Sequence, residues 1–118
     1  MASYRLPQGT PEEQGRRDAE IQQALRCAAT VPMEVARKAT EIYEQLRQLE
    51  AISSPAMLSD LRVGRLMAAA AARGALENVA INLESITDAE FANAMSAESA
   101  SIEARLGESP VGAERSSN

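Results

Sequence analysis

Alanine is the residue that most constrains how this chain can fold, because it fills 23 of the 118 positions while aromatic residues make up only 3%. Alanine is the best helix former but offers little apolar area to bury, so stability must come from closely packed helices. Period-two alternation of β-branched residues, which would indicate strands, is hard to find. The composition predicts an all-α protein, and the length suits one domain.

The first helix is predicted over residues 10–29. Thr10 is the expected N-cap, Pro11 occupies the first helical position and Glu13 closes a capping box. A stripe of period 3.6 predicts the buried face, which consists of Ile21, Ala24, Leu25 and Ala28. Cys27 lies beside this stripe, and we expect it to be a small core residue rather than a nucleophile.

Thr30 and Pro32 interrupt the helical pattern, and a second helix is predicted over residues 32–52. Its apolar residues recur at steps of four and three, a spacing that predicts a seam against a partner helix. The residues of this seam are Val35, Ala39, Ile42, Leu46 and Leu49.

A third helix is predicted over residues 60–86, because Pro55 breaks the pattern before it and Ser59 can cap it. One line along this helix consists of small residues closed by two amides: Gly64, Ala68, Ala71, Ala75, Asn78 and Asn82. Small side chains at this spacing let another helix approach closely.

The fourth helix is predicted to follow Thr87 or Asp88 as its cap and to end at residue 106. Its apolar side consists of Phe91, Met95, Ile102 and Leu106. Residues 107–118 have no apolar period, and we expect a disordered tail there. The fold expected for residues 1–106 is a four-helix bundle-like domain. The domain has too few large side chains to cover the apolar faces of all its helices. We therefore predict a homodimer with the third helix near the contact.

Charge and residue content exclude several classes of function. The net charge of −5 and the scattered basic residues argue against nucleic-acid binding. One cysteine and no histidine leave no zinc site and no histidine-activated nucleophile. An acid or base must therefore be a carboxylate, Lys38, Cys27 or a tyrosine. We expect no metal and no cofactor. No stretch approaches the ~20 apolar residues of a membrane span, so we predict a soluble, cytoplasmic protein without membrane partners.

Three segments, in this order, resemble the formiminotransferase-cyclodeaminase C-terminal domain family, which includes bacterial methenyltetrahydrofolate cyclohydrolases. They are `YRLPQGTPEE`, the `VPMEVA` segment and `SDLRVGRLMAAAAARGALENVAINLESITDAEF`. The resemblance covers about residues 4–91. It implies a helical dimer that acts on one-carbon tetrahydrofolates, by eliminating ammonia from a formimino group or by adding water to a methenyl group.

The chain departs from this family pattern in two places. Its `MASYRLPQGT` corresponds to a stretch in the middle of the family domain, so the front of the domain is expected to be missing. Ser53 and Ser54 stand where relatives commonly have a Gly-Asn pair, so a loop that needs the positive φ of glycine would be reshaped.

The resemblance also suggests site residues. Ring opening or closure at a methenyl carbon moves protons, and Asp60 of the `SD` motif is the candidate acid/base; alternatively it is a first-turn acid at a helix start. Asn78 and Asn82 present donors and acceptors that suit the pterin edge, or they form a polar pair that fixes helix register. Three arginines are candidates for the glutamate tail of the folate, or are solvated surface residues: Arg62, Arg65 and Arg73.

Two functions therefore remain open at this stage. One is a short cyclodeaminase or cyclohydrolase whose cleft is completed by dimerisation or repacking. The other is a non-catalytic helical module that binds a folate-like ligand or only a partner chain.

Overall fold

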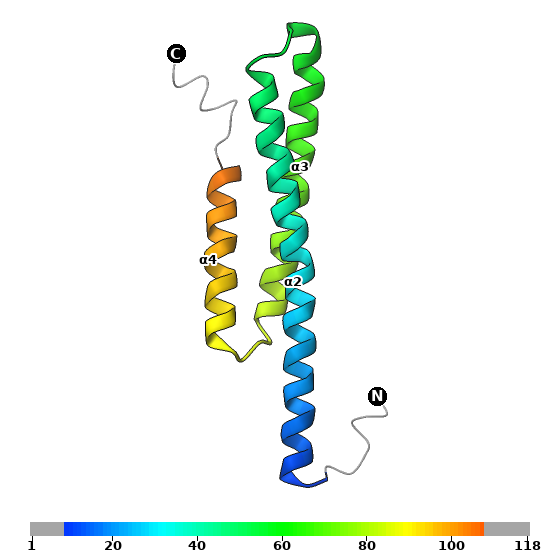
Figure 1. The fold of residues 1–118 in the computed structure, drawn as a ribbon, viewed down its shortest axis with the longest axis vertical. Helices are drawn as coiled ribbons and strands as arrows, with labels where there is room; N and C mark the ends of the chain where they lie inside the picture. The colour runs from blue at the N-terminus through cyan, green and yellow to red at the C-terminus, as the bar shows by residue number, and fades with distance from the viewer. Residues whose placement is uncertain (1–8, 108–118) are drawn as a thin grey trace.

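The computed structural model describes residues 9–107, which form three α-helices and no strand. Helix α2 spans Pro11–Glu50, α3 spans Pro55–Leu83 and α4 spans Ala89–Leu106. Figure 1 shows α2 and α3 side by side and antiparallel, with the shorter α4 against them. The all-α prediction is confirmed. The prediction of four helices is wrong, because the first two predicted helices form one continuous helix, Pro11–Glu50, within the described residues.

Helix α2 begins as the sequence predicts. The Thr10 hydroxyl accepts a hydrogen bond from the Glu13 amide at 3.2 Å, and the Glu13 carboxylate accepts one from the Thr10 amide at 2.9 Å. Pro11 occupies the first helical position, where its missing N–H costs nothing. The first turns of α2 extend beyond the ends of α3 and α4 (Figure 1).

Helix α2 passes through Pro32 because a side chain from α3 supplies the donor that proline lacks. Pro32 has no N–H, so the Ala28 carbonyl four residues earlier loses its helical partner. Asn82 of α3 donates its side-chain Nδ2 to that carbonyl at 3.2 Å. The Thr30 hydroxyl meanwhile donates to the Arg26 carbonyl at 2.8 Å. A proline that predicts a helix boundary is thereby tolerated inside the helix.

The buried side of α2 differs from both predicted stripes. Its buried residues are Ala29, Met33, Ala36, Ala39, Thr40 and Tyr43. Ile21, Ala24 and Ala28 are exposed, and Leu25 is only half-buried, so the predicted face of residues 10–29 is largely wrong. Cys27 is also exposed, which contradicts its prediction as a core residue. The continuous helix instead buries Ala29 and Met33, while Ala28 lines an open pocket between α2 and α3 and Leu25 packs against the edge of the core.

The predicted seam of residues 32–52 is also only partly buried within the chain. Ala39 is buried and Leu46 is half-buried, but Val35, Ile42 and Leu49 are 49%, 50% and 44% exposed. The apolar period exists, but three of its five residues are about half exposed within the chain.

Helix α3 begins earlier and ends earlier than predicted. Ser54, not Ser59, is the N-cap, and Pro55 takes the first helical position, where proline is favoured. The helix ends at Leu83 rather than Ile86. The predicted line of small residues is buried only in part, because Ala68 and Ala75 are buried while Ala71 and Asn78 are exposed. Ala72, which lies outside that line, is fully buried.

Helix α4 agrees closely with its prediction. Asp88 is the N-cap, and its carboxylate accepts a hydrogen bond from the Phe91 amide at 3.1 Å. Met95, Ile102 and Leu106 are buried, and Phe91 is half-buried against the core. The `YRLP` lead-in and most of the predicted tail, residues 108–118, lie outside the described residues.

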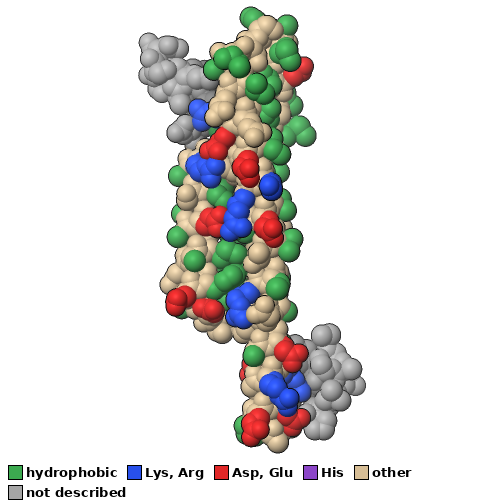
Figure 2. Space-filling model, viewed as in Figure 1, with side chains coloured by type: hydrophobic (Ala, Val, Ile, Leu, Met, Phe, Trp, Pro, Cys, Tyr) green, Lys and Arg blue, Asp and Glu red, His purple; other side chains and the backbone are tan. Residues whose placement is uncertain are grey.

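Two bidentate ion pairs attach α4 to α2. Arg37 of α2 donates to Glu98 at 2.6 and 2.7 Å, and Arg105 of α4 donates to Glu44 at 2.8 and 2.5 Å. Hydrogen bonds from these guanidinium groups lower the pKa of the Glu98 and Glu44 carboxyl groups. Figure 2 shows acidic and basic side chains interspersed over this side of the molecule. The contact between α4 and α2 is therefore charged at its rim.

Candidate functional site

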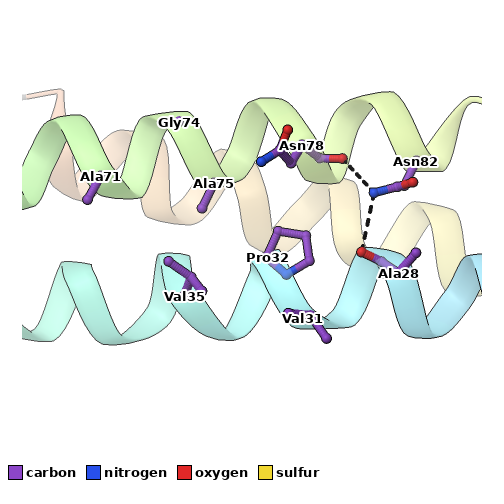
Figure 3. A pocket seen from close by; sticks show the side chains of 9 residues that line it. All are labelled: Ala28, Val31, Pro32, Val35, Ala71, Gly74, Ala75, Asn78 and Asn82. Atoms are coloured by element: carbon purple, nitrogen blue, oxygen red, sulfur yellow. Dashed lines mark hydrogen bonds between the residues drawn. The ribbon is translucent and has the colours of Figure 1, made fainter.

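An open pocket of about 440 Å³ lies between α2 and α3, and it is the site that brings two predicted residues together. Its wall is mostly apolar and contains no ionisable side chain. The lining residues are Ala28, Val31, Pro32, Val35, Ala71, Gly74, Ala75, Asn78 and Asn82. Figure 3 shows that α2 and α3 supply these side chains, with α4 behind the pair.

The two asparagines of this pocket differ in burial and in hydrogen bonding. Asn82 is half-buried, and its Nδ2 donates to the Ala28 carbonyl at 3.2 Å and to the Asn78 carbonyl at 3.0 Å. Its Oδ1 stays available as an acceptor. Asn78 is exposed, and its side-chain amide makes no hydrogen bond to any residue between 9 and 107. The pocket therefore offers one complete amide and one additional acceptor on an apolar wall.

Asp60, the predicted acid/base, lies elsewhere on the same helix. It is exposed and occupies the second turn of α3. Eighteen residues separate it from Asn78, which corresponds to roughly 27 Å along a helix. Within one chain, Asp60 and the asparagine pocket cannot contact the same ring of a ligand.

The three predicted arginines contact carboxylates or a carbonyl of the chain itself. Arg65 is buried and forms an ion pair with Glu50, which also lies 3.8 Å from Nε of Arg62. Arg73 Nε donates to Glu103 at 3.0 Å, and its Nη2 donates to the Leu106 carbonyl at 2.7 Å, at the end of α4. None of the three lines the asparagine pocket. Their contact with a folate tail stays a prediction that the structure does not test.

The sequence reasoning missed a buried polar cluster around Arg65. Its guanidinium carbon lies 5.9 Å from the centroid of the Tyr43 ring, within the range of a cation–π contact. Tyr43 and Arg65 are both 2% exposed. Among the described residues, Tyr43 Oη and Arg65 Nη1 have no hydrogen-bond partner. An arginine within the apolar period of α3 could have indicated this cluster.

A second missed residue is Gln22, whose side chain holds the connection between α3 and α4. Its Nε2 donates to the Ser85 carbonyl at 3.1 Å, and its Oε1 accepts from the Thr87 amide at 2.9 Å. Both backbone groups lie just after α3 ends and would otherwise lack a helical partner. No local sequence signal reveals this contact, because its partners are more than sixty residues apart.

Neither a metal cluster nor a membrane span occurs within residues 9–107. They contain no group of three or more His, Cys, Asp or Glu side chains that could hold a metal ion. None of the helices α2 to α4 is long and apolar enough to cross a membrane.

Comparison with known proteins places this arrangement in a family. The sequence profile described as formiminotransferase-cyclodeaminase matches residues 1–101. A formimidoyltransferase-cyclodeaminase of Gallus gallus is 43% identical over 91 residues, which are 77% of this chain and 17% of the relative. The enzyme of the same name from Rattus norvegicus is 35% identical over 91 residues, with the same shares.

A methenyltetrahydrofolate cyclohydrolase of Methylorubrum extorquens is 35% identical over 92 residues, which are 78% of this chain and 44% of the relative. The chain thus spans less than half the length of each of these relatives. The match nevertheless covers most of the chain, including α2, α3 and the asparagine pocket between them. The chain therefore belongs to the formiminotransferase-cyclodeaminase family.

Proposed function

We propose that this chain takes part in one-carbon folate chemistry, as a cyclodeaminase or cyclohydrolase that interconverts formimino-, methenyl- or formyl-tetrahydrofolate. The names of its relatives support this reaction class. The observation that carries the proposal to particular residues is the pocket between α2 and α3, with its apolar wall and the unengaged amide of Asn78.

The chemistry of a pterin fits this pocket. A pterin is flat and apolar on its faces, and it presents an amide and an amino group along one edge. The apolar wall would contact the ring face, while the Asn78 amide and Asn82 Oδ1 would form hydrogen bonds with the polar edge. Asn82 would thus serve two purposes, because its Nδ2 completes α2 and its Oδ1 would accept a hydrogen bond from the ligand.

The reaction also needs a proton donor or acceptor of suitable pKa. The pocket wall holds no ionisable group, so the acid/base must come from another position. Asp60 remains our candidate for this group. The folded unit we propose is a helical homodimer, in which two chains together form a larger helix bundle, and we propose a cytoplasmic location that cell fractionation would test.

The test uses the purified chain and 5,10-methenyltetrahydrofolate, whose near-ultraviolet absorbance is lost on hydrolysis. The wild type should accelerate this loss above the buffer rate, Asn78→Ala should weaken substrate binding, and Asp60→Asn should lower turnover. Asn93→Ala is a matched control, because Asn93 is an exposed asparagine on α4 that does not line the pocket. Ammonia release from 5-formiminotetrahydrofolate tests the deaminase reaction in parallel.

Saturable binding of the folate without turnover would instead support a non-catalytic ligand-binding module. The absence of both folate binding and turnover would refute the folate proposal.

A further inference from the structure

Gly74 lies in the interior of α3, where a glycine needs an explanation. The helix spans Pro55–Leu83, so Gly74 is well inside both ends. A glycine in a helix interior lowers stability relative to alanine, because it has more conformational freedom to lose on folding. Among residues 9–107, Gly9 is the residue with a positive φ, so the backbone of α3 does not require glycine at position 74.

The two glycines of α3 differ in their surroundings. A Cβ added at Gly64 would lie 3.2 Å from Cδ1 of Leu46, so the close contact between α2 and α3 accounts for that glycine. A Cβ added at Gly74 meets nothing within 4 Å beyond its own stretch of helix backbone. Packing within the described residues therefore gives no reason for glycine at position 74.

The open space beside Gly74 belongs to the asparagine pocket. Gly74 is exposed and lines this pocket with Asn78, which follows one turn later on the same side of α3. Side chains on a helix lean toward its N-terminus, so the Asn78 amide leans toward the space over Gly74. Figure 3 shows Asn78 Nδ2 on that side, with Pro32 and Val35 of α2 across the pocket.

A larger residue at position 74 would occupy the space next to the Asn78 amide. Residues four apart on a helix are neighbours, so a leucine at position 74 would pack against the Asn78 side chain. It would cover the polar group and narrow the gap between α3 and the apolar side chains of α2. Glycine instead leaves bare backbone there, which a ligand can approach closely.

We propose that the pterin ring lies against Gly74 while the polar edge of the ring binds the Asn78 amide. This inference rests on the proposed folate function. The ring is then held between the bare backbone of α3 and the apolar wall of α2, and the rest of the folate extends out of the pocket. Gly74 thereby determines specificity, because a flat ring fits against the backbone and a bulkier group does not.

Substitution by alanine separates this role from a structural one. Gly74→Ala should raise the urea concentration at the midpoint of unfolding, because alanine is the better helix former and its methyl group has room. In calorimetric titration, the same variant should bind 5-formyltetrahydrofolate about tenfold more weakly, the size of effect that one methyl group has in a binding pocket. Gly74→Leu should weaken binding further. A residue with only a structural role would not change stability and ligand affinity in opposite directions.

Gly15→Ala and Gly15→Leu are the matched controls. A Cβ at Gly15 also meets nothing within 4 Å, and Gly15 belongs to α2 but does not line the pocket. Both controls should leave folate binding unchanged. Sedimentation of every variant completes the comparison. Weaker binding by Gly74→Ala together with a changed sedimentation coefficient would overturn the proposal, because Gly74 would then contact another chain rather than the ligand.

Protection from a thiol reagent tests the position of the ring directly. The exposed Cys27 is first replaced by serine, and Gly74→Cys is made in that background. Saturating pterin should slow the reaction of the new thiol with a maleimide, whereas p-aminobenzoylglutamate, the other half of a folate, should not. Gly15→Cys in the same background should react at one rate with or without either compound.

The possible failures are distinguishable. Protection by p-aminobenzoylglutamate instead of pterin would overturn the role of Gly74 while the folate function stands. So would unchanged folate binding by Gly74→Ala and Gly74→Leu, or a Gly74→Ala variant that is less stable than wild type. A wild type that does not bind 5-formyltetrahydrofolate would refute the folate function, and the role of Gly74 with it.

Discussion

The contact between Asn82 and the Ala28 carbonyl gives the sharpest test of how this fold is held together. Asn82→Ala removes the side-chain donor to that carbonyl, which has no N–H partner four residues later because Pro32 stands there. The same substitution in a Pro32→Ala background should matter less, since replacing the proline restores the helical N–H four residues after Ala28. The two positions should therefore be energetically coupled.

The structure sets the expected magnitude. A typical hydrogen bond adds about 0.5–1.5 kcal/mol to stability. Ala28 is exposed, so water can replace part of the lost contact, and we expect Asn82→Ala to cost about 0.5–1 kcal/mol. Pro32→Ala alone should stabilise the protein by up to about 3 kcal/mol, the helix-interior difference between the two residues. In that background, Asn82→Ala should cost less than about 0.3 kcal/mol.

The assay is urea unfolding followed by far-ultraviolet circular dichroism for wild type, both single variants and the double variant. All four must be measured at one protein concentration, because self-association would raise apparent stability. Asn78→Ala is the control, since the Asn78 side chain is exposed and makes no hydrogen bond to the described residues, and it should change stability little. An equal cost of Asn82→Ala with and without Pro32 would refute the reasoning.

Three further predictions follow from the ion pairs and the helix cap. Glu50→Gln should destabilise the protein by about 2–4 kcal/mol in urea unfolding, because it removes the partner carboxylate from the buried Arg65; a change below about 1 kcal/mol would contradict this. The pKa values of Glu44 and Glu98 are lowered by their arginine partners, so each pair stabilises the fold above the unfolded pKa of about 4.3 and loses this effect as pH falls through the folded value. The double variant Glu44→Gln/Glu98→Gln should therefore show a smaller change in the free energy of unfolding between pH 5 and pH 2. These groups are partly exposed, so the difference from wild type should be less than about 2 kcal/mol. An unchanged pH profile would refute this prediction. Thr10→Ala should speed hydrogen exchange in the first turn of α2 and leave the core amides unchanged, whereas uniform acceleration would show that the cap contributes to global stability.

The N-caps of α2 and α4 could be predicted from the sequence, because the groups that form each cap are close neighbours in the chain. The capping box at Thr10 and the cap at Asp88 involve residues three positions apart, so the sequence displays both partners at once. The same reasoning failed at Pro32, because the donor that compensates for it lies fifty residues later on α3. Propensity near a proline predicts a break only when no tertiary contact replaces the missing N–H.

The candidate site was predictable in part for the same reason. Asn78 and Asn82 are four residues apart on one helix, so their shared location could be inferred, and the structure places both in one pocket. The distance of Asp60 from the two asparagines follows from the rise of a helix. Whether Asp60 can act on a ligand in the asparagine pocket depends on what covers the exposed side of α2 and α3. The place of Arg65 within the apolar period of α3 could have indicated its burial, but its partner Glu50 could not be inferred from spacing, because Glu50 lies across the α2–α3 turn.

The dependence of Pro32 on Asn82 has an evolutionary consequence. A lineage that keeps the proline should keep an amide at position 82, because its loss leaves a helix carbonyl without a donor. A lineage that replaces the proline no longer needs a side-chain donor to this carbonyl from position 82. Substitutions at these two positions should therefore covary, and an asparagine kept at position 82 without the proline would favour the proposed ligand contact.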